Sequence, residues 1–172
     1  LGVYIFYRVK VGLNYKWAWH VIPQYLFRYD EEKGRWVMNM LMLGLNTTIW
    51  LSIWATLLAT ALGLVFGFFR ISGSLFKRML GRTYVELIRN TPPLVLIFIF
   101  YFFISDQFIP LIGIDNVVRN CSPGLQNVLT FIAAPPEVFS AFISATVTVA
   151  LFEGGYITEI VRAGVQSIER GQ

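Results

Sequence analysis

Residues 37–69, VMNMLMLGLNTTIWLSIWATLLATALGLVFGFF, contain no charged side chain. A membrane-spanning helix needs roughly 20 consecutive apolar residues, so this run is longer than one crossing requires. Asn46, Thr47 and Thr48 indicate that its first part lies at the membrane interface. The sequence therefore predicts a span over about 44–69. Composition agrees: 56% of the residues are hydrophobic and only 14% are charged, against about a quarter in soluble domains.

Two further apolar runs predict spans over about 93–112 and 138–158. The second span follows a helix-start pattern, Thr91, Pro92 and Pro93, in which a hydroxyl can cap free backbone amides. Proline in the first turn costs no hydrogen bond there. We therefore expect an all-α integral membrane protein with three core transmembrane helices.

The loop between the first two spans, residues 70–92, is strongly basic. It contains a single acid, Glu86, and the basic residues Arg70, Lys77, Arg78, Arg82 and Arg89. Short basic loops between spans stay on the cytoplasmic side, which places the segment before the first span outside the cytoplasm. Residues 1–36 carry more basic than acidic residues as well, but the short loop between two spans is the stronger signal.

The segment before the first span divides into two parts. Residues 1–7 are apolar but too short to span, and we expect them to be the end of a truncated N-terminal transmembrane helix. A signal peptide is the less favoured alternative, because no small-residue cleavage site follows. In residues 8–43, aromatic side chains alternate with charged ones, which predicts an extracytoplasmic, interfacial segment. An ordinary extramembrane loop is the open alternative.

Small and hydroxylated residues recur at four-residue spacing from Gly44 to Thr60 in the first span, and Gly63 and Gly67 follow. Such residues let helix backbones approach closely, so we interpret the stripe as a helix-packing surface. The alternative is that it lines a pathway. The stripe consists of Gly44, Thr48, Ser52, Thr56, Thr60, Gly63 and Gly67.

Glu153 is a carboxylate inside the third predicted span. A charge within a span costs roughly 2.5–3.5 kcal/mol at the membrane centre and usually faces a bundle interior or a water-filled cavity. Thr146 and Tyr156 fall near the same helix face. These residues predict a substrate pathway, for example for an ammonium group. The alternative is that Glu153 pairs with a basic side chain and fixes packing.

The sequence lacks the residues that several classes of protein function require. Cys121 and His20 are the chain's single cysteine and histidine, so we expect no thiolate or histidine metal site and no cofactor. No phosphate-binding loop is present, and the net charge of +4 gathers in loops rather than in a nucleic-acid motif. An intramembrane enzyme would need a partner for Glu153 at the same depth. We therefore expect a protein that is not an enzyme.

Two stretches together resemble a known family. The first is YVELIRNTPPLVLIFIFYF, residues 84–102, and the second is YITEIVRAGVQSIERGQ, residues 156–172. They are similar to the permease subunits of ATP-binding-cassette (ABC) importers for polar amino acids, of the histidine/glutamine/arginine type. The resemblance covers roughly residues 40–172. It implies the N-terminal part of the type I importer permease fold, with residues 44–172 as an incomplete permease transmembrane domain.

The resemblance also implies a function and a set of partners. The chain would be a multi-pass protein of the bacterial cytoplasmic (inner) membrane that forms the pathway of an ATP-driven amino acid importer. Its partners would be membrane lipid, a second permease subunit in a homodimer or heterodimer, a separate cytoplasmic ATPase and an extracytoplasmic binding protein. Gln172 would lie just before the Glu-Ala-Ala coupling loop. A non-transporting membrane scaffold or assembly subunit is the alternative.

Overall fold

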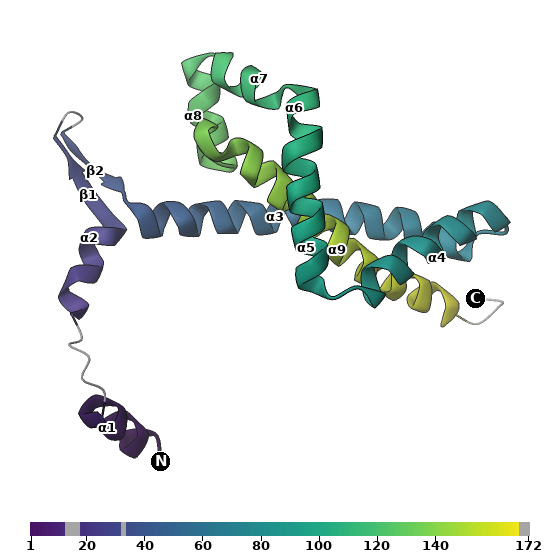
Figure 1. Ribbon diagram of the computed structural model, residues 1–172, viewed down its shortest axis with the longest axis horizontal. Coiled ribbons are helices and arrows are strands. Elements are labelled where there is room, and N and C mark those ends of the chain that lie inside the picture. The colour runs from purple at the N-terminus through teal and green to yellow at the C-terminus, as the bar shows by residue number, and fades with distance from the viewer. Residues whose placement is uncertain (13–17, 32–33, 169–172) are drawn as a thin grey trace. The chain divides into compact units, whose positions relative to one another are not determined.

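A computed structural model gives the structure of residues 1–12, 18–31 and 34–168 (Figure 1). The last residues of the second family-like stretch, 169–172, lie outside this description. The chain divides into two compact units, Leu1–Leu45 and Asn46–Gln172. This division falls beside residue 44, where we expect the permease domain to begin.

Long apolar helices dominate the described part of the chain. Two stretches are long and apolar enough to cross a membrane: α3 (Met40–Ile71), and Pro136–Gln166, in which a short turn, η3 (Pro136–Val138), leads into α9 (Phe139–Gln166). Helices α4 (Leu75–Asn90) and α5 (Pro93–Phe103) meet at a bend of 114° and form a third crossing if the pair is one broken span.

The first unit departs from a purely helical expectation. Residues 2–7 belong to a longer helix, α1 (Gly2–Gly12), which continues past Arg8 and Lys10. Two short helices, η1 (Trp19–Val21) and α2 (Ile22–Leu26), then lead into a two-stranded antiparallel sheet.

The sheet is a hairpin of β1 (Phe27–Asp30) and β2 (Arg35–Met38). Aromatic and charged residues alternate along β1, a period of two that suits strands rather than a helix, whereas β2 reads Arg-Trp-Val-Met. Tyr29 and Trp36 lie opposite each other, with ring centroids 5.7 Å apart and an edge-to-face angle of 73°. Such cross-strand aromatic pairs stabilise two-stranded sheets. Part of the 8–43 segment therefore forms a hairpin.

The second predicted span is helical throughout but not uniform. Helix α5 begins at Pro93, and the chain continues through a π-helical turn, η2 (Ile104–Phe108), into α6 (Ile109–Ile112). Pro110 cannot donate a backbone hydrogen bond, and the wider π turn directly precedes it. At the other end, the Thr91 hydroxyl does not cap α5 as expected. It donates to the Leu87 carbonyl of α4, at 2.8 Å, because Thr91 ends that helix.

Two short helices follow, α7 (Ile114–Asn120) and α8 (Pro123–Ile132), and the chain turns sharply between them (Figure 1). They return the chain to the start of α9. A small apolar cluster closes this end of the unit. It consists of Val118, Ala133, Ala134, Phe139 and Phe142.

Helix α9 is the centre of the second unit, since it packs against α3, α4 and α5. Gly63 and Gly67 let α3 approach it closely. A methyl group on Gly63 would overlap the Ile157 side chain, and one on Gly67 would lie 2.6 Å from the Val161 Cγ1 atom. Both glycines are buried, so the close approach of α3 and α9 depends on the absence of a side chain at these two positions.

Candidate functional site

A groove between α3 and α9 contains the Glu153 side chain. Each helix contributes residues four positions apart, which lie one above the other on a single helix face. The groove has a volume of about 290 Å³. Its lining consists of Leu51, Ser52, Ala55, Thr56 and Ala59 from α3, and of Val149, Glu153 and Ile157 from α9.

Packing of the neighbouring glycines determines which way Glu153 points. A methyl group on Gly154 would lie 2.8 Å from the Tyr84 hydroxyl oxygen, and one on Gly155 would lie 2.7 Å from the Ile88 Cγ2 atom. That side of α9 is therefore closed by α4, with Leu62 of α3 also 3.3 Å from the added methyl group at Gly154. Glu153 is exposed, on a different side of the helix.

The Glu153 carboxylate has capacity for an external partner. No other described residue makes a hydrogen bond or ion pair with it, and the described lining of the groove contains no lysine or arginine. Ser52 shares the groove and donates its hydroxyl hydrogen to the Thr48 carbonyl, at 2.8 Å, so its oxygen remains an acceptor. A carboxylate among acceptor oxygens and apolar walls attracts a cation, such as an ammonium group.

Thr146 and Tyr156 do not line this groove. Thr146 lines a separate apolar cavity of about 350 Å³, together with residues such as Trp54 and Phe142. Its side chain is buried, and among the described residues its Oγ1 atom has no hydrogen-bond partner. Tyr156 is partly exposed and lies edge-to-face with Phe152. Glu153, Thr146 and Tyr156 therefore do not form the single polar surface that the sequence indicated.

The stripe of small residues on α3 divides in the same way. Gly63 and Gly67 lie in the helix crossing, whereas Ser52 and Thr56 line the Glu153 groove. Gly44, Thr48 and Thr60 are exposed. The row that α3 buries shares Gly63 and Gly67 with the stripe, but it contains two alanines in place of the neighbouring Thr56 and Thr60. This buried row is Ala55, Ala59, Gly63 and Gly67.

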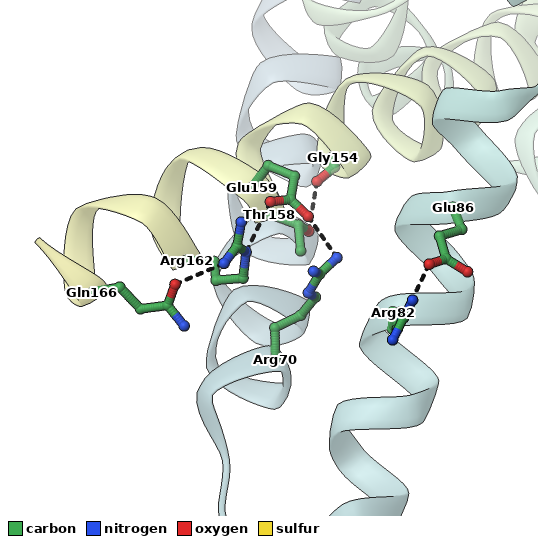
Figure 2. Close-up of polar contacts among 8 residues, drawn as sticks. All are labelled: Arg70, Arg82, Glu86, Gly154, Thr158, Glu159, Arg162 and Gln166. Atoms are coloured by element: carbon green, nitrogen blue, oxygen red, sulfur yellow. Dashed lines mark hydrogen bonds and ion pairs between the residues drawn. The ribbon is translucent and has the colours of Figure 1, made fainter.

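Sequence reasoning missed a charge link between α3 and α9. The spacing of Glu159 and Arg162 suggests a pair on one helix, and the Arg162 Nε atom indeed lies 2.8 Å from Glu159 Oε2. The other carboxylate oxygen of Glu159 lies 2.5 Å from Arg70, at the end of α3; Figure 2 shows both contacts of this carboxylate. These residues are far apart in the sequence, so no local pattern indicates their contact.

Metal binding has no support in the described residues, since no three or more His, Cys, Asp or Glu residues gather there to hold an ion. Glu153 and the α3 hydroxyls give the groove electrostatic attraction and hydrogen bonding.

Comparison with known proteins gives relatives at moderate identity. The chain is 29% identical over 160 residues to the glutamate/aspartate import permease protein GltJ of Escherichia coli, which covers 93% of this chain and 57% of that protein. It is 30% identical to the probable glutamine ABC transporter permease protein GlnM of Bacillus subtilis, over 78% of this chain and 49% of that protein.

The glutamine transport system permease protein GlnP of Escherichia coli is 27% identical over 77% of this chain and 48% of its own length. No protein-family profile and no solved structure matches the chain. The chain spans about half the length of the curated relatives that it matches. These relatives favour the transporter hypothesis over a membrane scaffold.

The relatives and the apolar helices lead to the same conclusion. Helices long enough to cross a membrane fit a permease, and the chain is a multi-pass protein of the bacterial cytoplasmic membrane, as its relatives are. Proteins of this kind are not themselves enzymes. The chain is a homologue of the permease subunits of amino acid ABC transporters.

Proposed function

We propose that this chain is part of the permease subunit of an ATP-driven amino acid importer, and that the Glu153 groove forms part of the substrate pathway. The observation that carries the proposal is a carboxylate without a partner among the described residues, in a groove between two membrane-spanning helices. A charge at such depth costs free energy unless it faces water or a ligand. The homology to amino acid permeases supplies the class of ligand.

The proposal includes the partners that the family implies. A second permease subunit, identical or different, would complete the pathway. A separate cytoplasmic ATPase would hydrolyse ATP, and an extracytoplasmic binding protein would deliver the amino acid. Residues 44–172 would form the permease transmembrane domain, residues 8–43 the extracytoplasmic interfacial segment, and residues 70–92, which contain helix α4 rather than a simple loop, would face the cytoplasm.

The charge of the groove favours some amino acids over others. Every amino acid carries an α-ammonium group, which the Glu153 carboxylate can bind. An acidic side chain would bring a second carboxylate beside Glu153, and like charges at close range repel. The groove therefore suits amino acids with neutral or cationic side chains better than glutamate or aspartate, although GltJ is named for those two.

The test is uptake by the full-length gene product, assembled with its ATPase and binding protein in proteoliposomes. Replacing Glu153 by Gln keeps the shape of the side chain and removes its charge. We expect uptake of the favoured amino acid to fall roughly tenfold or more, as for loss of a hydrogen bond to a charged group. Purification yield should be unchanged, because Glu153 makes no hydrogen bond or ion pair with another described residue.

The matched control is Glu137→Gln, which removes an exposed carboxylate at the start of the same helical stretch. It should leave uptake unchanged. Unaltered uptake by the Glu153→Gln transporter would show that the carboxylate has no role in the pathway. Uptake of glutamate in preference to glutamine or arginine by the unmodified transporter would overturn the proposed preference.

A further inference from the structure

A second groove lies where the ends of α3 and α9 meet α4, and it is strongly basic. Its volume is about 310 Å³, and none of its described lining residues is acidic. Two apolar side chains and one amide complete the lining. The lining residues are Arg70, Leu75, Arg78, Met79, Arg82, Arg162 and Gln166.

The acids near this groove neutralise only part of its charge. Glu159 binds both Arg70 and Arg162, at 2.5 and 2.8 Å. Arg82 pairs with Glu86 at 2.7 Å, but both side chains are more than half exposed, and such a pair is easily exchanged for another partner. The groove therefore retains surplus positive charge.

Arg78 contributes most to that surplus. Its side chain makes no hydrogen bond or ion pair with another described residue. Arg78 and Arg82 are four residues apart on α4, so their like charges lie on one helix face and repel each other. A bound anion would relieve that repulsion. Gln166 accepts a hydrogen bond from Arg162 through its Oε1 atom, at 2.7 Å, and keeps its NH₂ group as a further donor (Figure 2).

Apolar residues adjoin the arginines. Leu75 and Met79 are four residues apart on α4 and are 64% and 59% exposed. They line the same groove as the arginines. A free inorganic anion would gain nothing from these side chains, whereas an amphiphilic anion would bury them. The groove thus combines donors for a phosphate with an apolar surface for the carbon chain attached to it.

We propose that this groove binds the phosphate group of an anionic phospholipid. Arginine forks match the geometry of phosphate oxygens, and basic pockets between transmembrane helices suit anionic head groups. Arg70 and Arg162, held by Glu159, supply fixed donors. Arg78 and Arg82 close on the phosphate, and Leu75 and Met79 contact the first carbons of the acyl chains.

The experiment uses the purified full-length protein in its transporter complex. Native mass spectrometry measures the phosphatidylglycerol and phosphatidylcholine that remain bound after detergent exchange from equimolar mixtures. We expect phosphatidylglycerol to remain preferentially, and the double variant Arg78→Gln/Arg82→Gln to lower its retention at least fivefold. Lys77→Gln is the matched control, because Lys77 is adjacent on the same helix but does not line the groove.

Each other outcome contradicts the proposal. Equal retention of the two lipids, or equal losses in the double variant and in Lys77→Gln, would mean general attraction to a basic surface. Displacement of phosphatidylglycerol by millimolar inorganic phosphate would mean a site for the free anion. If the double variant kept its lipid but lost the ATPase subunit, the groove would serve a protein partner.

The lipid site and the transport proposal fail separately. Lipid retention is measured without substrate, ATP or turnover, and none of the varied arginines lines the Glu153 groove. A transporter that loses phosphatidylglycerol in the double variant would support the lipid site even if Glu153→Gln left uptake unchanged.

Discussion

The Glu153 groove and the arginine groove have opposite charge, and the arginine groove also extends onto α4. Both use side chains of α3 and α9, and Glu153 and Arg162 are separated by roughly 13 Å along α9, at 1.5 Å per residue. The Glu153 groove contains one carboxylate and no described cation. In the arginine groove, two of the four arginines share Glu159.

This difference separates two uses of charge in a membrane protein. Glu159 stabilises the arrangement of α3 and α9, because one carboxylate joins arginines from both helices. Glu153 joins nothing in the described structure, so its free-energy cost is unexplained by packing. Glu159 thus has a structural role, whereas the open groove beside Glu153 is the basis of the pathway proposal.

The largest loss of thermal stability should come from changing the crossing of α3 and α9, which positions both grooves. Gly63→Ala together with Gly67→Ala would force the Ile157 and Val161 side chains away from α3. Overpacking of this kind costs about 3 kcal/mol, so we expect a large fall in Tm and loss of monodisperse protein. Fluorescence-detected size exclusion after heating measures this.

Gly44→Ala is the control for this crossing, since a methyl group there meets no atom within 4 Å. It should leave the Tm unchanged or raise it slightly, because alanine favours helix more than glycine does. Equal behaviour of the two variants would mean that the α3–α9 crossing does not depend on close approach at Gly63 and Gly67.

A smaller effect should follow from removing the shared carboxylate. Glu159→Gln leaves Arg70 and Arg162 without a countercharge in a partly buried position, where Arg70 and Glu159 are 17% and 18% exposed. We expect a loss of about 1–2 kcal/mol, below the cost of a fully buried pair.

The exposed pair provides the contrast: Glu86→Gln should give no measurable change in Tm, because Arg82 and Glu86 are 71% and 52% exposed. Thermal unfolding of both variants tests the ranking. A Glu86→Gln effect as large as that of Glu159→Gln would contradict the structural role of Glu159.

The smallest effect should occur in the uncharged cavity beside Thr146. The Thr146 hydroxyl is buried without a described hydrogen-bond partner. Thr146→Val should therefore leave the Tm unchanged or raise it, with a gain of about 0.5–1 kcal/mol in the free energy of unfolding. Thr148→Val, by contrast, should lower the Tm, because the hydroxyl that it removes donates to the Ser144 carbonyl at 2.7 Å. Loss of transport on Thr146→Val would mean that this hydroxyl contacts substrate.

The long helices of the fold could be predicted from the sequence, because runs of apolar residues are a strong local signal. Helix α3 extends a few residues beyond 44–69, and 93–112 is helical from end to end. The hairpin at β1 and β2 was missed. The alternation of aromatic and charged residues in β1 is a strand pattern, but aromatic and charged residues together also fit a membrane interface.

The candidate site could be predicted only in part. Glu153 is conspicuous as a charge in an apolar run, but its neighbours Ser52 and Thr56 come from another helix. Helical spacing suggested Thr146 as a neighbour, whereas the tilt of α9 across α3 places it at a different cavity. Contacts such as Arg70 with Glu159 depend on that crossing, and no local pattern in the sequence encodes it.

The most direct measurement of the central claim is water access to the Glu153 groove. Single cysteines are placed at Thr56, which lines the groove, and at Leu57, which is exposed on α3 but does not line it. Cys121→Ser provides the background, and the assembled transporter is treated with a membrane-impermeant thiol reagent during turnover.

We predict that Thr56→Cys reacts at least tenfold faster than Leu57→Cys, and that the transported amino acid slows its reaction, because the groove alternately holds water and substrate. Equal rates at the two positions, or a Thr56→Cys rate that substrate does not change, would contradict a substrate pathway beside Glu153.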